Sequence, residues 1–289
     1  MENIIGVDIG GTSIVGGRIE GHRIVAQVTT DTHAQEGGEK TLDILKEVIR
    51  RLMTTETKAI GIGVPSVVDR EKGIVYNVQN IKEWEEIHLK SILEKEFNIP
   101  VYLDNDANCF AYGEKIFGKG RAFKNFVGIT LGTGVGGGII QNHRLLLDSN
   151  GGAGEFGEIP YLDSILEDYC GSRFFTRTTG LSAYDIARKA REGDTQSINV
   201  YNEYGRHMAV LVKIIILILD PQAIIFGGSI SQSFELFRES MYENLKDFPY
   251  PRSVAKIQIM TSDLLHMGIL GAGALCLDAN SELVSNSID

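Results

Sequence analysis

The stretch Asn3-Ile-Ile-Gly-Val-Asp-Ile-Gly-Gly-Thr-Ser-Ile-Val-Gly16 opens the chain, and its pattern returns in Asn125-Phe-Val-Gly-Ile-Thr-Leu-Gly-Thr-Gly-Val-Gly-Gly-Gly138. At one constant spacing, four residues of the first stretch match the second: Asn3, Gly6, Gly10 and Gly16. After a one-residue deletion, His22-Arg23 also falls on His143-Arg144. A chance likeness between two glycine-rich strands would not extend into the polar turn that follows, so the pattern favours a duplication.

Each copy is a strand, a tight glycine turn, a second strand, a short polar turn and a third strand. Beyond the copies, apolar strands alternate with helical periodicity, which indicates an α/β class with a mainly parallel sheet in each half. Helices are expected over 39–53, 89–97, 107–117, 196–219, 232–247 and 266–277. Strands are expected over 3–8, 13–20, 23–29, 58–64, 100–103, 125–130, 135–141, 145–147, 223–226 and 255–260. We expect two packed domains with a cleft between them. The first covers 1–117, completed by a C-terminal helix at about 266–289, and the second covers 118–265.

The composition excludes several classes of protein. The 289 residues carry a net charge of −10, which argues against a dedicated nucleic-acid binder. Three cysteines without a C-x-x-C pair indicate a reducing compartment. No signal peptide is evident at the N-terminus, and the strongest apolar run, 210–219, is much shorter than the ~20 residues of a membrane helix. We therefore expect a cytoplasmic protein that binds neither nucleic acid nor a membrane.

Glycine is in excess, with 33 glycines against 6 prolines. The glycines cluster at 10–17, 132–138, 151–157 and 227–228. The segment Gly132–Gly137 formally fits G-x-G-x-x-G, but it continues as a strand instead of opening a helix, which excludes a Rossmann fingerprint. A P-loop motif is absent as well. Because glycine turns after strands let backbone N–H groups approach an anion, two such turns predict a polyphosphate site.

Two carboxylates at strand ends are informative, and Asp8 lies beside the first glycine turn. Asp8 ends the first strand, where a carboxylate can hold hydrated Mg²⁺ near phosphates; an Asx-type turn is the alternative. Asp106 lies at a strand end and a helix start, where it is either an N-cap or a base close to a bound ligand. Phosphoryl transfer needs such a base within reach of the acceptor hydroxyl.

Five motifs resemble, in order, those of the ROK family, which contains repressors, open reading frames and sugar kinases. The resemblance runs from Ile4 to about Leu277. The motifs are Asp8-Ile-Gly-Gly-Thr12, Leu103-Asp-Asn-Asp-Ala-Asn108, Leu131-Gly-Thr-Gly-Val-Gly-Gly-Gly138, Gly154-Glu-Phe-Gly157 and Ala223-Ile-Ile-Phe-Gly-Gly-Ser229.

The resemblance implies an actin-like ATPase, ribonuclease-H-like duplicated two-domain fold with an interdomain cleft that closes over a sugar. It implies ATP and Mg²⁺ as cofactors and a homodimer. Asp106 would be the catalytic base, and Asp8 would associate with magnesium and phosphate. Phosphate contacts would come from Gly10, Gly11, Thr12, Gly132, Thr133 and Gly134, and adenosine would lie over Gly227 and Gly228. The sugar would be held by Asn105, Asp106, Glu155 and Glu167.

The chain departs from the family pattern at three places. Ser13 replaces a usual Lys, and Ser66 replaces a usual Gly. Many members also carry a zinc-binding His and a C-x-C-G-x-x-G-C segment, whereas here Glu158 takes the His position and the cysteines are missing. Cys170 alone cannot supply about four donors, so we expect no structural zinc. The loop is expected to be held by packing of Tyr161, Leu162 and Ile165, and Glu158 is expected to face the sugar.

The expected activity is ATP-dependent phosphorylation of the 6-hydroxyl of a hexose, with glucose favoured. An N-acetylglucosamine or N-acetylmannosamine kinase and a β-glucoside kinase are the alternatives. A sugar-responsive transcription regulator is a different class. It is disfavoured because the first expected strand begins at residue 3 and leaves no room for a helix-turn-helix, and because the charge is acidic.

Overall fold

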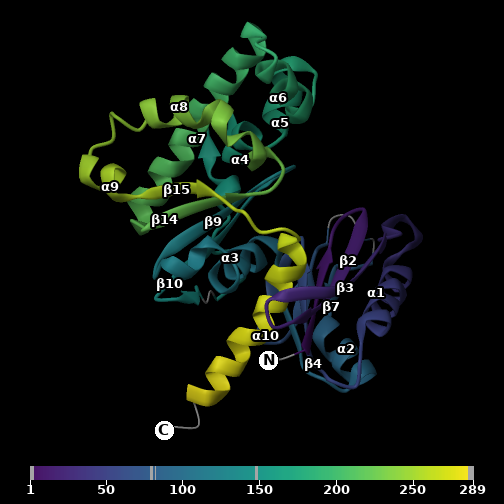
Figure 1. Cartoon of the computed structure of the whole chain (residues 1–289). Helices are drawn as coiled ribbons and strands as arrows, with labels where there is room; N and C mark the ends of the chain where they lie inside the picture. Colours follow the sequence, from purple (N-terminus) through teal and green to yellow (C-terminus); the bar gives the residue numbers. More distant parts are fainter. Residues whose placement is uncertain (1–2, 79–80, 82, 147–148, 286–289) are drawn as a thin grey trace. The chain divides into compact units, whose positions relative to one another are not determined.

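The computed structural model describes residues 3–78, 81, 83–146 and 149–285. Internal contacts divide the chain into two compact units (Figure 1). The first comprises 1–121, 144–153 and 264–289, and the second comprises 122–143 and 154–263. This division assigns 144–153 to the first unit, whereas the domain boundaries expected from the sequence place these residues in the second. The expected boundaries and the cleft stay predictions.

The chain forms two five-stranded sheets with the same strand order. The first sheet runs β3-β2-β1-β4-β8 and the second β11-β10-β9-β14-β15. In each, the middle strand pairs antiparallel with the hairpin strand and parallel with the next strand. This shared order confirms the duplicated α/β fold. The strands are β1 (Asn3–Ile9), β2 (Ser13–Glu20), β3 (Arg23–Asp31), β4 (Thr57–Val64), β8 (Val101–Asn105), β9 (Phe126–Leu131), β10 (Val135–Gln141), β11 (Arg144–Leu145), β14 (Ala223–Gly227) and β15 (Gln258–Thr261).

The strand register corrects the alignment of the two copies. In the first hairpin Val7 faces Gly16, whereas in the second Ile129 faces Gly137. The residue of the second copy that is equivalent to Gly16 is therefore Gly137, not Gly138. The turn of the second hairpin is one residue shorter, so the deletion lies inside the glycine turn and not at the later polar turn. Ladder pairing reveals this because it fixes which residues stand opposite each other.

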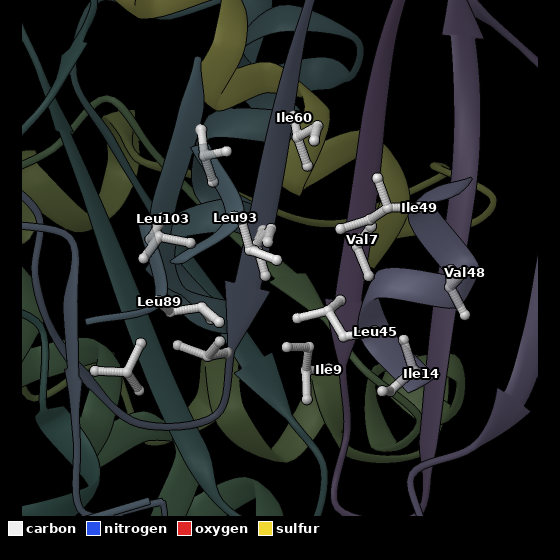
Figure 2. Packing of buried hydrophobic residues seen from close by; sticks show 14 of the residues in the cluster. Val7, Ile9, Ile14, Leu45, Val48, Ile49, Ile60, Leu89, Leu93 and Leu103 are labelled. Atoms are coloured by element: carbon white, nitrogen blue, oxygen red, sulfur yellow. The ribbon is translucent and has the colours of Figure 1, made fainter. Parts of the chain in front are cut away.

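The first sheet is covered on both faces. On one face, α1 (Gly38–Leu52) and α2 (Leu89–Phe97) bury an apolar core with residues such as Ile9, Leu45 and Leu103 (Figure 2). On the other, Ile4, Ile19 and Ala59 pack with α10 (Met267–Ser285). Strand alternation explains this division, because successive side chains of β1 point to opposite faces.

The second unit contains more helices than the two that were expected there. The expected helix 232–247 is a 3-10 turn, η4 (Ile230–Ser233), followed by α8 (Phe234–Glu243). The expected strand 255–260 is wrong at its start, because Pro251 opens α9 (Pro251–Lys256) before β15 begins. The other helices of the second unit are α4 (Leu166–Cys170), α5 (Arg173–Thr179), α6 (Ala183–Arg191) and α7 (Thr195–Leu219), of which α4, α5 and α6 were not predicted. The first unit also contains α3 (Asp106–Ile116).

Several short elements also escaped prediction, because two- and three-residue strands carry no periodicity. They are β5 (Val67–Asp69), β6 (Ile74–Tyr76), β7 (Glu86–Ile87), β12 (Pro160–Tyr161), β13 (Ser164–Ile165) and the 3-10 turns η1 (Ala34–Glu36), η2 (Lys119–Ala122) and η3 (Phe156–Glu158). The expected strand 145–147 is shorter, since β11 ends at Leu145; residue 147 lies outside the described residues. None of the helices in the described part of the chain has the length and apolar character that crossing a membrane requires.

Candidate active site

The end of β8 and the start of α3 place Asn105 and Asp106. The N-cap of α3 is Asn105, whose Oδ1 accepts a hydrogen bond from the Asn108 N–H at 2.7 Å. The alternative that Asp106 caps this helix is therefore wrong: Asp106 is the first helical residue. With its Oδ1 used in the cap, Asn105 has its Nδ2 group to offer a ligand.

Asp106 is exposed to solvent, but the surrounding protein partly desolvates its carboxyl group, and this desolvation raises its pKa above the ordinary value. The N–H groups of Ala107 and of Asp106 itself act in the opposite direction, but their effect is smaller. A carboxylate with a raised pKa is a better proton acceptor than a free one. The chemistry therefore suits a general base.

A buried ion pair that sequence reasoning missed lies under this pair. Asp104 is only 2% exposed, and its Oδ2 lies 2.8 Å from Nε of Arg70. Its Oδ1 accepts from the Asn105 backbone N–H at 2.8 Å and from Asn108 Nδ2 at 2.9 Å. Asp104 thus fixes both ends of the Asn105 cap. No motif in the sequence links Asp104 to Arg70, which lies 34 residues earlier in the chain.

Asp8 is half-buried near the end of β1, beside the first turn of α10. Burial raises its pKa to about 6, and the negative charge of Asp106 adds to the rise. The Asp8 carboxylate fills the space that a side chain at Gly268 would need. No sequence pattern indicates this contact, since the two residues are at opposite ends of the chain. A carboxylate whose ionised form is this disfavoured fits a Mg²⁺ ion or its water, which would offset the charge.

The first glycine turn is held by hydrogen bonds at Gly10, and two of its other N–H groups lack an acceptor in the described part of the chain. Gly10 N–H donates to the Ser13 carbonyl at 2.8 Å, and Thr32 Oγ1 donates to the Gly10 carbonyl at 2.9 Å. Within the described residues, the N–H groups of Gly11 and Thr12 have no protein acceptor. Neither glycine of the turn has a positive φ, so a left-handed hairpin conformation does not explain them. Two unsatisfied donors in a glycine turn suit a phosphate.

The second turn has the same character. Gly132 N–H donates to the Gly134 carbonyl at 3.1 Å, whereas no acceptor among the described residues pairs with the N–H of Thr133 or Gly134. A side chain added at Gly132 would meet nothing within 4 Å. At Gly134 it would meet Glu167 Oε2 at 2.5 Å. This carboxylate accepts from the Val135 N–H at 3.1 Å, so Glu167 braces the turn.

The segment after the third glycine cluster carries the other two predicted sugar ligands. Glu155 and Glu158, at either end of η3, are both exposed. The expectation that Leu162 holds the loop is wrong, because it is 71% exposed at the tip of the β12–β13 hairpin. Tyr161 and Ile165 are partly buried, and Tyr161 makes the contacts described below.

The donors around this segment do not fit zinc. Cys170 is buried, and burial raises its pKa, which disfavours the thiolate that zinc requires. No group of three or more His, Cys, Asp or Glu side chains in the described part of the chain could hold a metal ion. The absence of zinc stays a prediction.

Gly228 adopts φ +83°, and a side chain there would collide with the backbone of Leu131. Close approach of β14 to the second turn therefore requires glycine. Ser231 Oγ donates to the Gly228 carbonyl at 2.8 Å. Ser231 also lines a cavity of about 600 Å³ that neither Gly227 nor Gly228 lines; the other lining residues are Gln232, Phe234, Glu235, Arg238, Glu239, Tyr242, Thr261 and Ser262.

Two duplicated sheets of this order, each ending in a glycine turn with open N–H groups, define an actin-like ATPase fold. The ROK family model matches residues 4–174 and 172–279, and the chain belongs to this family.

The chain is similar to proteins of two activities. It is 30% identical to a glucokinase from Thermotoga maritima, over 94% of this chain and 96% of that protein. It is 28% identical to a xylose repressor from Bacillus spizizenii, over 99% of this chain and 78% of the repressor. Among solved structures, a ROK family glucokinase from Streptomyces griseus in complex with glucose and AMPPNP matches with a TM-score of 0.80 and 27% identity, over 94% of this chain and 98% of that one.

Proposed function

We propose that the protein is an ATP-dependent hexose kinase that transfers the γ-phosphate of Mg-ATP to the 6-hydroxyl of a hexose, with glucose favoured. The observation that carries the proposal is Asp106, a carboxylate with a raised pKa, exposed at the start of α3 and held by the Asp104–Asn105 cap. The similarity to glucokinases supports it.

In this reaction Asp106 accepts the proton of the 6-hydroxyl as that oxygen forms a bond to the γ-phosphorus. The bond between the γ-phosphorus and the β,γ-bridging oxygen breaks, and ADP leaves. Hydrogen bonds to the sugar hydroxyls orient the sugar. The Nδ2 group of Asn105 donates to a hydroxyl oxygen, and hydroxyl groups donate to the carboxylates of Glu155, Glu158 and Glu167.

The phosphates are held by the open N–H groups of the two glycine turns, at Gly11 and Thr12 and at Thr133 and Gly134. Asp8 would hold Mg²⁺ through water, and the ion supplies neutralisation of the charge on the phosphates when bound. The cavity next to Gly228 offers Phe234 and Tyr242 for the adenosine.

The base assignment is tested by Asp106→Asn. Turnover should fall below detection, because the amide cannot accept the proton, while calorimetric glucose binding persists. Asp43→Asn, an exposed change on α1, is the matched control and should keep full activity. Unchanged turnover in Asp106→Asn would remove Asp106 as the base.

The choice of sugar is tested separately. A panel of hexoses, N-acetylglucosamine, N-acetylmannosamine and β-glucosides, compared by kcat/KM with ATP, should give the highest value for glucose. If kcat/KM is higher for an N-acetylhexosamine or a β-glucoside, that sugar, and not glucose, is the substrate. If no sugar is phosphorylated but sugars bind, the chain is instead a sugar-responsive member, the class that the xylose repressor represents.

Two further expectations accompany this function: the chain works as a homodimer and in the cytoplasm. Light scattering of the purified protein should give twice the monomer mass of 31.8 kDa. A monomer at the concentration of the kinase assay would contradict the first.

A further inference from the structure

Four rings from three helices and one strand meet next to the predicted sugar loop. We call Tyr161, Tyr169, Phe174 and His207 the aromatic–histidine cluster. Tyr161 in β12 hydrogen-bonds His207 of α7 across 3.1 Å between its hydroxyl and Nδ1. The His207 ring lies 4.8 Å from the ring of Tyr169 and 5.3 Å from that of Phe174, and Tyr161 lies edge-on to Tyr169 at 5.1 Å. The cluster ties β12, α4 and α5 to the long helix α7.

Further contacts enclose the cluster. The Arg177 guanidinium lies over the Tyr169 ring at 4.3 Å, and the Tyr169 hydroxyl donates to Asp163 in the β12–β13 hairpin. Tyr204, one turn before His207, donates to the Cys170 carbonyl at the end of α4 at 2.7 Å. Side-chain contacts thereby hold both ends of the segment between Glu158 and Gly171.

From α4 the contacts continue to the second glycine turn. Glu167 accepts from the Val135 N–H, as described above, and the Ser172 N–H donates to the Gly132 carbonyl at 2.9 Å. Tyr169 lies between these two residues in the chain. A shift of α4 would therefore move Glu167 and the carbonyl side of the turn together.

We propose that the aromatic–histidine cluster is a positioning device that sets α4, and through it both Glu167 and the Gly132–Gly134 turn, by ring packing in place of a metal ion. His207 and Tyr161 are positioning residues, since neither is placed on substrate. The kinetic part of this inference rests on the proposed hexose kinase activity. The structural part does not, because it concerns only the order of the 159–172 segment and of the Gly132–Gly134 turn.

The structural part is tested by hydrogen exchange on His207→Ala, Tyr161→Phe and Tyr184→Ala. His207→Ala should increase exchange in peptides covering 159–172 and 132–135. Tyr161→Phe keeps the ring and loses one hydrogen bond, so its effect should be intermediate. Tyr184, 75% exposed on α6, is the control and should change nothing. Should His207→Ala lose the circular dichroism of the folded chain, His207→Leu, which also removes the ring and the hydrogen bond but fills more of the space, takes its place in the comparison.

The kinetic part follows the same variants. The hexose KM of His207→Ala should rise about ten-fold or more above that of wild type, because small displacements of binding groups carry such costs. The KM of Tyr161→Phe should rise much less, because this variant keeps the ring. Wild-type protein washed with a chelator should show unchanged exchange and contain no stoichiometric zinc by elemental analysis. Unchanged exchange in the histidine variants, or loosening of 159–172 by the chelator, would overturn the proposal. Absence of kinase activity in the wild type would refute the proposed function and leave the exchange result to decide the positioning role.

Discussion

At the scale of single residues, the positions of the carboxylates Asp106 and Asp8 depend on the residues that surround them. Asp106 is held through Asn105 and Asp104, and Asp104 is paired with Arg70 in a buried position. Asp8 is held in the space that Gly268 leaves. The sequence motifs identify both carboxylates, because each lies at the end of a strand within a motif of the family. They do not identify Arg70 or Gly268, whose roles depend on distant contacts.

Gly268→Ala should lower activity without unfolding the chain. The new methyl group would collide with the Asp8 carboxylate and displace it, and a displacement of this kind costs on the order of 10²-fold in kcat/KM at most. The measurement is the kcat/KM for hexose and ATP, with Leu265→Ala, a change at a 79% exposed side chain, as the control. Wild-type kcat/KM in Gly268→Ala would show that this position of Asp8 is not needed.

At the scale of elements, the segment from η3 to α4 shows how a short stretch acquires a fixed shape. Its strands have two residues each, and no periodicity announces them. The expectation that packing holds this loop was right in kind for Tyr161 and wrong for Leu162. The partner of Tyr161, His207, lies near the middle of a helix whose sequence is typical of an apolar core, so no sequence pattern connects the two residues.

The stability of this region should depend on pH through His207. Burial lowers the pKa of His207 below its ordinary 6.5; Arg177 and Arg206 lower it too, while Glu203 raises it. Tyr161, Tyr169 and Phe174 are the other groups that face the ring. With a lower pKa in the folded state, the stability contributed by the neutral ring is present above pH 6.5 and is lost as the pH falls through the folded pKa.

The unfolding free energy of wild type should therefore fall between about pH 7.5 and about pH 5.5 by more than that of His207→Phe. Urea unfolding of both proteins across this range is the measurement. Asp8, whose pKa is raised, acts in the opposite sense in both, so the difference between the proteins isolates His207. Equal pH dependence would contradict a buried neutral ring.

At the scale of the whole molecule, one sheet order is used twice, and glycine serves two purposes in it. Part of the glycine excess forms the phosphate turns, as the sequence predicts. Another part lets α10 approach the first sheet: side chains at Gly6 or Gly61 would strike the α10 backbone at Ile269 or Ala272. This second use was not predicted, because it joins residues from opposite ends of the chain.

Gly61→Ala should destabilise the folded chain. Its added methyl group would meet the Ala272 carbonyl group, with 2.7 Å to the carbon, and such overpacking costs roughly 1–3 kcal/mol. Chemical unfolding gives this value directly, with Gly152→Ala as control because a side chain there meets nothing within 4 Å. A stability equal to wild type would mean that α10 can move away from β4 without cost.

The sequence by itself determined the duplicated α/β class, the two glycine turns and the two carboxylates at strand ends, because these features depend on local patterns: apolar runs, glycine after a strand, and motif order. Tertiary structure alone decided the true equivalence of Gly16 with Gly137, the pairing of Asp104 with Arg70, the fit of Asp8 to Gly268 and the ring cluster around His207. Each of these depends on packing between segments distant in the chain, and packing leaves no periodic signal in a single sequence.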